Sequence, residues 1–203
     1  MEPLIPECSY HIYNHSNGND LLFKEEKNYF YFLERYKKFI SPVANTYAYC
    51  LMPNHFHIIV KIRKEKEIVL ELRSDKAKEK YNKLEIVSDK ENFISLFVSK
   101  QFSNLFSSYS QAFNKMYNRK GSLFIKNFKR KLIDNDMYFL KLINYVHLNP
   151  VVHGFVQNVE EWRFSSYNAI LSDGQTLVKR EEVIALFDDL DNFKYCHLEP
   201  MEI

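Results

Sequence analysis

The sharpest chemical feature of the sequence is a pair of histidines separated by one residue, His55 and His57. They open the segment HFHIIVKI (55–62), whose composition predicts a β-strand. Side chains at positions i and i+2 of a strand project from the same face, so both imidazoles point one way and Phe56 points the other. Two neutral imidazoles on one face can bind a divalent ion if at least one further ligand joins them. Two surface histidines on an edge strand explain the same pattern without a metal.

A second feature combines a tyrosine and an asparagine four residues apart, Tyr145 and Asn149 in YVHLNP (145–150). On a helix these two side chains share a face. A tyrosine beside a metal-held phosphate can act as a nucleophile, and an amide oxygen can supply a hard ligand to the same metal. The structural alternative is a tyrosine packed in the core and an asparagine that caps the helix before Pro150.

A third feature is the basic stretch NRKGSLFIKNFKRK (118–131), in which phenylalanines alternate with cationic side chains. The cations can follow a phosphate backbone while the rings stack on bases. Solvated lysines on a loop explain the composition nearly as well. The candidate DNA-binding residues are Arg119, Lys120, Lys126, Lys129, Arg130 and Lys131.

The elements expected around these residues mix strands and helices without regular βαβ alternation. Alternating, aromatic and β-branched residues predict strands over 8–15, 45–52 and 55–62, and one short strand within 118–131. Apolar residues at three- and four-residue spacing predict helices over 24–40, 93–116 and 137–149, and a short final helix near 180–190. Pro150 is expected to end the third of these helices. This order predicts an α+β fold.

Composition narrows the classes of function. The 203 residues carry 28 basic and 26 acidic side chains, a net charge of +2, so a nucleic-acid surface must be a local patch. The three cysteines are widely spaced and form no CxxC motif, which argues against a disulfide framework and a structural zinc site. No P-loop is present, so no nucleotide cofactor is expected. Because neither a signal peptide nor an apolar stretch of roughly 20 residues is visible, we expect no membrane partner and a cytoplasmic location.

Five segments of the chain form one pattern in a fixed order. They are Tyr10-His11, CLMPNHFHIIVKI (50–62), GSLF (121–124), YFLKLINYVHLNPVVHGFV (138–156) and WRFSSY (162–167). Together they resemble the REP-associated tyrosine transposases, relatives of the single-tyrosine HUH transposases of small insertion sequences. MPNHFH followed by YVHLNP is far more specific than either motif alone.

The resemblance implies a ferredoxin-like α+β domain, in which an antiparallel sheet carries the two histidines and helices cover one face. We expect this domain to span residues 1–168. The charged stretch over about 63–92 has no counterpart in the pattern and is expected to be a solvated helical insertion. Residues 169–203 are expected to form a helical C-terminal tail.

The resemblance also assigns roles to individual residues. It implies His55 and His57 as ligands of Mg²⁺ or Mn²⁺, Asn149 as the third ligand and Tyr145 as the nucleophile. The remaining histidines of interest receive no role, and they are His11, His15, His147 and His153.

These roles predict a metal-dependent single-stranded DNA endonuclease and strand transferase, that is, a transposase that forms a 5′-phosphotyrosine intermediate at hairpin-containing DNA. Single-stranded or hairpin DNA is the expected partner, a homodimer is compatible with the family, and the bacterial cytoplasm or nucleoid is the expected location. Two alternatives stay open. One is a non-catalytic, domesticated protein that binds hairpin DNA, and the other is a metal-dependent hydrolase in which Tyr145 is structural. A covalent protein–DNA adduct separates the transferase from both.

Overall fold

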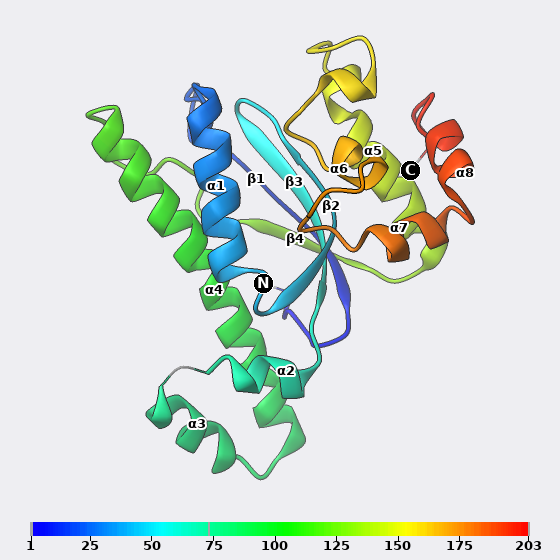
Figure 1. Ribbon diagram of the computed structural model, residues 1–203. Helices are drawn as coiled ribbons and strands as arrows, with labels where there is room; N and C mark the ends of the chain where they lie inside the picture. Colours follow the sequence, from blue (N-terminus) through cyan, green and yellow to red (C-terminus); the bar gives the residue numbers. More distant parts are fainter. Residues whose placement is uncertain (1, 73, 203) are drawn as a thin grey trace.

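A computed structural model describes residues 2–72 and 74–202 and is built on a four-stranded antiparallel sheet (Figure 1). The strands are β1 (Ser9–His15), β2 (Ala44–Leu51), β3 (His55–Ile62) and β4 (Lys129–Ile133), in the order β2-β3-β1-β4. Helix α1 (Glu26–Phe39) follows β1, and helix α4 (Val87–Met116) precedes β4. This β-α-β-β-α-β order is that of ferredoxin-like folds. The predicted α+β class with an antiparallel sheet is confirmed.

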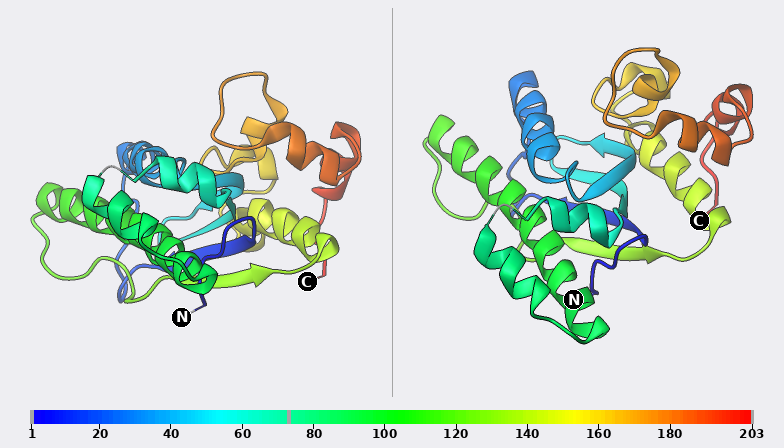
Figure 2. Two further views of the ribbon diagram at one scale, coloured as in Figure 1. Left: turned by 90° about the horizontal axis from the view of Figure 1, so that it is seen from below. Right: turned by 60° about the horizontal axis from the view of Figure 1, so that its bottom comes forward.

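Helices cover both faces of the sheet, whereas the expectation placed them on one face. Helices α1 and α4 lie on one side, and helix α5 (Asp136–Val152) lies with the C-terminal segments on the other (Figures 1 and 2). The reason lies in α5 itself, which buries apolar side chains around most of its circumference. A helix that is apolar nearly all round needs protein contacts on more than one side. It is therefore enclosed between the sheet and the tail.

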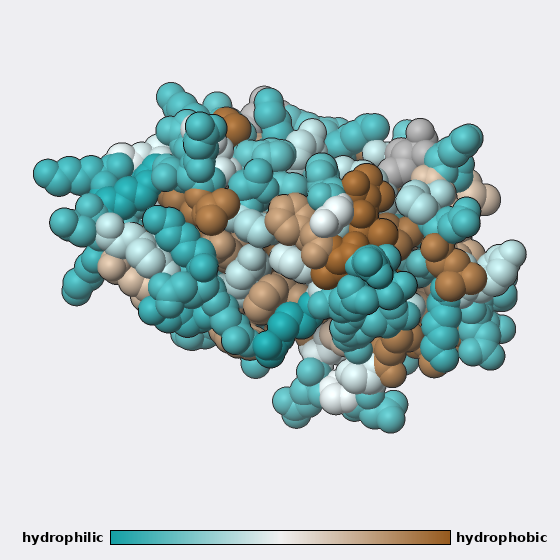
Figure 3. Space-filling view, turned by 90° about the horizontal axis from the view of Figure 1, so that it is seen from above, coloured by the Kyte–Doolittle hydropathy of each residue, from teal (hydrophilic) through white to brown (hydrophobic). Residues whose placement is uncertain are grey.

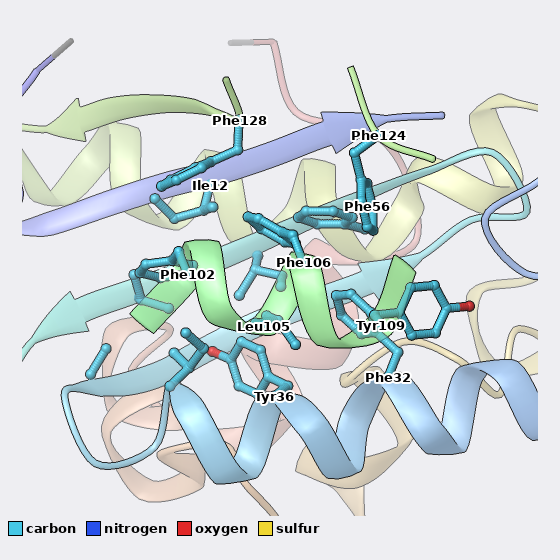
Figure 4. Packing of buried hydrophobic residues seen from close by; sticks show 14 of the residues in the cluster. Ile12, Phe32, Tyr36, Phe56, Phe102, Leu105, Phe106, Tyr109, Phe124 and Phe128 are labelled. Atoms are coloured by element: carbon cyan, nitrogen blue, oxygen red, sulfur yellow. The ribbon is translucent and has the colours of Figure 1, made fainter. Parts of the chain in front are cut away.

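The face covered by α1 and α4 holds an aromatic core. Strand residues Ile12 and Phe56 point into it, together with rings from both helices (Figure 4). The ring centroids of Phe56 and Phe106 lie 5.6 Å apart, and those of Phe106 and Phe124 lie 5.1 Å apart. Phe128 is buried in the same core, so both phenylalanines of the basic stretch pack inside the protein and do not stack on bases.

The charged stretch after β3 forms two short helices, α2 (Glu65–Leu70) and α3 (Asp75–Asn82), and then the start of α4. Helix α3 has no buried residue, as expected for a solvated insertion. The insertion is held on α4 through apolar contacts such as that between Tyr81 and Phe93, whose ring centroids lie 5.8 Å apart. The limits predicted for this insertion and for the domain as a whole stay predictions.

The C-terminal part consists of the 3₁₀ turn η1 (Val159–Glu161) and helices α6 (Tyr167–Leu171), α7 (Arg180–Leu186) and α8 (Leu190–Cys196). Their apolar side chains form a second core with α5 and β2. In the view from above, the surface is mostly hydrophilic and its apolar side chains gather right of centre (Figure 3). Within residues 2–72 and 74–202, every helix is too short or too polar to cross a membrane.

Helix α5 does not end at Pro150, contrary to expectation. Its N-cap is Asn135, whose Oδ1 accepts a hydrogen bond from the backbone N–H of Tyr138 at 2.8 Å. It then continues through Pro150 to Val152. Gly154, at φ +70°, ends it, because its N–H donates to the carbonyl of Val151 while the N–H of Phe155 donates to that of Pro150. This Schellman motif satisfies the last carbonyls, so Pro150 costs one backbone hydrogen bond without stopping the helix.

Candidate active site

Strands β1 and β3 bring several aromatic side chains onto the sheet face that α5 covers. In the β1–β3 register Tyr13 lies opposite His57, and His15 lies opposite His55. Residues directly opposite each other in an antiparallel pair point to the same face. Phe56 points into the aromatic core on the other face, as the strand period predicted. The two histidines therefore face α5.

Helix α5 carries Tyr145 and Asn149 to the same two histidines. Asn149 Oδ1 lies 3.0 Å from His55 Nε2, and the ring of Tyr145 meets that of His57 edge to face with centroids 5.4 Å apart. The His55 and His57 ring centroids are 5.2 Å apart. All four candidate residues meet within a single chain. Asn149 is fully buried, and Tyr145 is half-buried at the edge of the cluster.

Two further residues belong to this cluster and were not identified from the sequence. His11 on β1 places Nε2 at 2.8 Å from His57 Nδ1. Asn54, directly before β3, places Oδ1 at 2.7 Å from His55 Nδ1. The alternation of the first strand puts His11 on one face. The register pairs His11 with Ile59, so His57 is its diagonal neighbour on that face.

Burial keeps the histidines of this cluster neutral. It lowers the pKa of His11 to about 4 and that of His55 to about 4, and desolvation is the largest cause for both. The pKa of His57 falls to about 2, first through desolvation and then through the neighbouring His11. Neutral imidazole is the form that binds a metal, so the cluster presents ligand nitrogens without competition from protons near pH 7.

The residues present fit a divalent ion only if an amide serves as a ligand. Within the described residues, no group of three or more His, Cys, Asp or Glu side chains is arranged to hold a metal. The buried Nδ2 of Asn149 has no hydrogen-bond partner, and its Oδ1 points at His55 Nε2. His55, His57 and Asn149 would hold such an ion, with Asn149 supplying its amide oxygen beside the imidazole of His55.

The six basic candidates divide into two kinds. Lys129 lies opposite Tyr13 and Lys131 opposite His11, so both are on the histidine face of the sheet, and both are exposed. Lys120 and Lys126 are also exposed.

The two arginines of the basic stretch make contacts inside the protein. Arg119 forms an ion pair with Asp20, and its Nη1 donates to the carbonyl of Gly121 at 3.2 Å. Arg130 points to the opposite face of β4, where its guanidinium lies 4.2 Å from the Phe128 ring centroid. These contacts tie both arginines to local structure.

The sequence and the fold of this chain are similar to those of known proteins. No protein-family model matches the sequence. A Haemophilus influenzae protein described as "Putative REP-associated tyrosine transposase" is 22% identical over 125 residues, which cover 61% of this chain and 58% of that protein. A solved REP-associated tyrosine transposase bound to a REP hairpin aligns over 87% of both chains, with a TM-score of 0.55 and 16% sequence identity. Both comparisons support the predicted resemblance to REP-associated tyrosine transposases.

The resemblance rests on segments that the fold brings together. Two of the matching segments, 50–62 and 138–156, supply the histidine pair, Tyr145 and Asn149. A third, Tyr10-His11, supplies the partner of His57. The segments that carry the predicted resemblance thus meet around one point on the sheet, although 138 positions separate His11 from Asn149 in the chain.

Proposed function

We propose that this protein is a metal-dependent nuclease and strand transferase that cuts single-stranded DNA beside a hairpin, with Tyr145 as the nucleophile. The observation that supports this most strongly is the meeting of Tyr145, Asn149, His55 and His57 on one face of the sheet. The likeness to a transposase bound to a REP hairpin supports hairpin DNA as the substrate.

His55, His57 and Asn149 are the proposed ligands of Mg²⁺ or Mn²⁺. When bound, such an ion polarises a non-bridging phosphate oxygen and stabilises the charge that develops on it. The chain itself supplies the shape of the site, because α5 holds Asn149 against the sheet and shields the ligands from water on that side. A shielded site strengthens electrostatic interactions with the phosphate.

Tyr145 is proposed to attack the scissile phosphorus through its phenol oxygen. The new bond joins this oxygen to phosphorus, the bond from phosphorus to the 3′ oxygen breaks, and the 3′ oxygen leaves as a hydroxyl after taking up a proton. The product is a 5′-phosphotyrosine, which keeps one phosphodiester linkage for each one broken. A 3′ hydroxyl can therefore reverse the step and join a new strand, without any nucleotide cofactor.

The test uses labelled hairpin oligonucleotides that carry sequence flanking the protein's own gene, with Mg²⁺ or Mn²⁺, read on a denaturing gel. A labelled band at protein mass is expected for the natural chain and absent for Tyr145→Phe. Tyr195→Phe is the matched control, because Tyr195 is 73% exposed on α8. Binding without linkage or cleavage would favour a non-catalytic hairpin-binding protein, and cleavage without linkage would favour a hydrolase.

A homodimer and a location in the bacterial cytoplasm or nucleoid stay predictions. Gel filtration with and without hairpin DNA measures the first of these.

A further inference from the structure

We propose that His11 and Asn54 are positioning residues of the metal site, which fix the protonation of the two ligand histidines. Each accepts a hydrogen bond from the Nδ1–H of one histidine, so that Nε2 of His57 and of His55 stays unprotonated and able to bind the metal. The inference rests on the proposed function for the identity of the metal ligands, and deepens it by adding two residues to the site.

The two ring nitrogens of His55 each face the amide oxygen of an asparagine. His55 Nδ1 lies 2.7 Å from Asn54 Oδ1, and an amide oxygen can only accept a hydrogen bond. Asn149 Oδ1, 3.0 Å from His55 Nε2, also only accepts, so a neutral His55 donates to one of these two oxygens. We assign the proton to Nδ1, which leaves the Nε2 lone pair facing Asn149 Oδ1. Two acceptors held this close are stabilised by a cation shared between them.

The His11–His57 contact obeys a similar constraint. Both rings are buried, and His11 Nε2 lies 2.8 Å from His57 Nδ1, so one nitrogen donates and the other accepts. If His11 donated, neutral His57 would carry its proton on Nε2 and could not bind a metal through that atom. Donation by His57 Nδ1 leaves His57 Nε2 free. We assign this direction.

Tyr13 holds the two rings of this pair in a common orientation. It stacks on His11 with ring centroids 4.8 Å apart and on His57 with centroids 5.8 Å apart. The planes of His11 and His57 are inclined by only 25°. A ring fixed in this way cannot turn to exchange its two nitrogens without breaking the stack. Partners that orient metal-binding histidines typically change metal affinity by about 10- to 100-fold when they are removed.

The first test is histidine-ring ¹H–¹⁵N NMR on the metal-free full chain. His55 and His57 are each expected as the Nδ1–H tautomer, with resonances assigned through single substitutions. In His11→Phe, which keeps a ring without an acceptor, the His57 signal is expected to shift toward the Nε2–H tautomer. In His11→Gln, whose amide oxygen can accept near the position of Nε2, the Nδ1–H tautomer is expected to remain.

The second test is titration of the same proteins with Mn²⁺, followed by electron paramagnetic resonance. Removing the acceptor in His11→Phe, or in Asn54→Leu, is expected to weaken Mn²⁺ binding by about 10- to 100-fold. The acceptor-retaining variants His11→Gln and Asn54→Asp are expected to stay within about threefold of the natural chain. The two pairs are independent, so one variant that fails to fold leaves the other pair informative.

Several outcomes overturn the inference. They are an Nε2–H proton on His57 in the natural chain, natural Mn²⁺ affinity in His11→Phe and Asn54→Leu, or equal loss in the acceptor-retaining variants. Failure of the proposed function looks different. If the tautomers and Mn²⁺ affinities come out as expected but no covalent DNA adduct forms, the positioning roles hold and the strand-transferase assignment does not.

Discussion

Two groups of buried histidines lie on either side of α5, and their hydrogen bonding differs. In the C-terminal core, His147 Nδ1 lies 2.9 Å from His197 Nε2, and His147 Nε2 lies 2.7 Å from Ser166 Oγ. His197 Nδ1 reaches the carbonyl of Phe193 at 2.7 Å. Both ring nitrogens of each histidine therefore have a partner.

The direction of this chain of hydrogen bonds is fixed from one end. A carbonyl only accepts, so His197 Nδ1 donates to it and His197 Nε2 accepts from His147 Nδ1. His147 Nε2 then accepts from the Ser166 hydroxyl, whose oxygen accepts from the backbone N–H of Tyr49 at 2.8 Å. We call this series of hydrogen bonds the closed chain, because each ring nitrogen in it has a partner. It links the C-terminal segments to α5 and β2.

The cluster on the sheet is open by contrast. With the proton of His55 on Nδ1, as proposed, the cluster ends in two acceptors, His55 Nε2 and Asn149 Oδ1, that face each other. The buried Nδ2 of Asn149 has no hydrogen-bond partner. Buried polar groups left in this state are costly unless a ligand completes them. Histidine burial by itself therefore does not distinguish the proposed metal site from the C-terminal core. The unpartnered amide nitrogen of Asn149 does distinguish it.

The largest expected effect is the loss of adduct formation when the histidines of the open cluster are replaced. His55→Ala combined with His57→Ala removes both nitrogen ligands. Because a bound metal contributes several kcal/mol to the stabilisation of the transition state, adduct formation is expected to fall by about 1,000-fold or more. Single-turnover assays with hairpin DNA measure this, and hairpin binding in a gel-shift assay is the control. Retention of metal-dependent adduct formation would place the metal elsewhere.

Next in size is the loss of stability from the closed chain. His147→Ala leaves His197 Nε2 without a partner, removes one of the partners of Ser166 Oγ and opens a cavity, which is expected to cost about 2–4 kcal/mol. The expected fall in Tm is roughly 5–15 °C for a chain of this size. Mn²⁺ affinity of the folded variant should stay unchanged. His15→Ala, at an exposed position, is the stability control and is expected to stay within about 0.5 kcal/mol. An unchanged Tm in His147→Ala would show that this series of hydrogen bonds does not stabilise the fold.

Acid should destabilise the protein through both groups. The pKa values of His11 and His55 fall to about 4, that of His57 to about 2, and that of His197 to about 4. Between about pH 6.5 and 4 the unfolded chain binds more protons than the folded one, so stability falls as pH falls. Each such histidine contributes up to about 1.4 kcal/mol per pH unit.

Urea unfolding at several pH values measures this slope. His57→Phe is expected to reduce the slope by one such contribution while leaving the part that comes from the C-terminal core. An unchanged slope in that variant would mean that His57 is protonated in the folded protein.

The smallest effect concerns DNA affinity beside the open cluster. Lys129→Ala with Lys131→Ala is expected to lower single-strand affinity and to reduce the slope of log affinity against log salt by up to about 1.4, since each phosphate contact contributes about 0.7. Lys66→Ala with Lys78→Ala, on the exposed insertion, is the matched control. Equal losses in both pairs would indicate a general charge effect and no DNA path along β4.

The parts of the site that follow local periodicity were visible in the sequence. Strand alternation placed His55 and His57 on one face, and helical spacing placed Tyr145 and Asn149 together. Contacts between residues that are far apart in the sequence could not be predicted from it. The partner of His57 is 46 positions away, and Arg119 meets Asp20 across 99 positions. Likewise, nothing local distinguishes the buried Phe124 and Phe128 from rings that stack on bases.

The C-terminal end of α5 could not be predicted from the sequence either. Proline rules favour an end at Pro150, but the backbone of Gly154 two residues beyond Val152 provides a better one. The extra length matters for the site, since Asn149 then lies within the helix, where its own carbonyl accepts from the N–H of His153 at 3.0 Å. A helical residue has a more restricted side-chain direction than a fraying end.

The charged insertion of α2 and α3 leaves the sheet at the opposite end of β3 from the histidine pair (Figure 1). Five residues of strand from His57 to Ile62 correspond to about 17 Å. A fluorophore or an affinity tag joined at the exposed Lys78 would therefore sit away from the histidine cluster. For protein engineers, this helical appendage offers an attachment point at a distance from the candidate site.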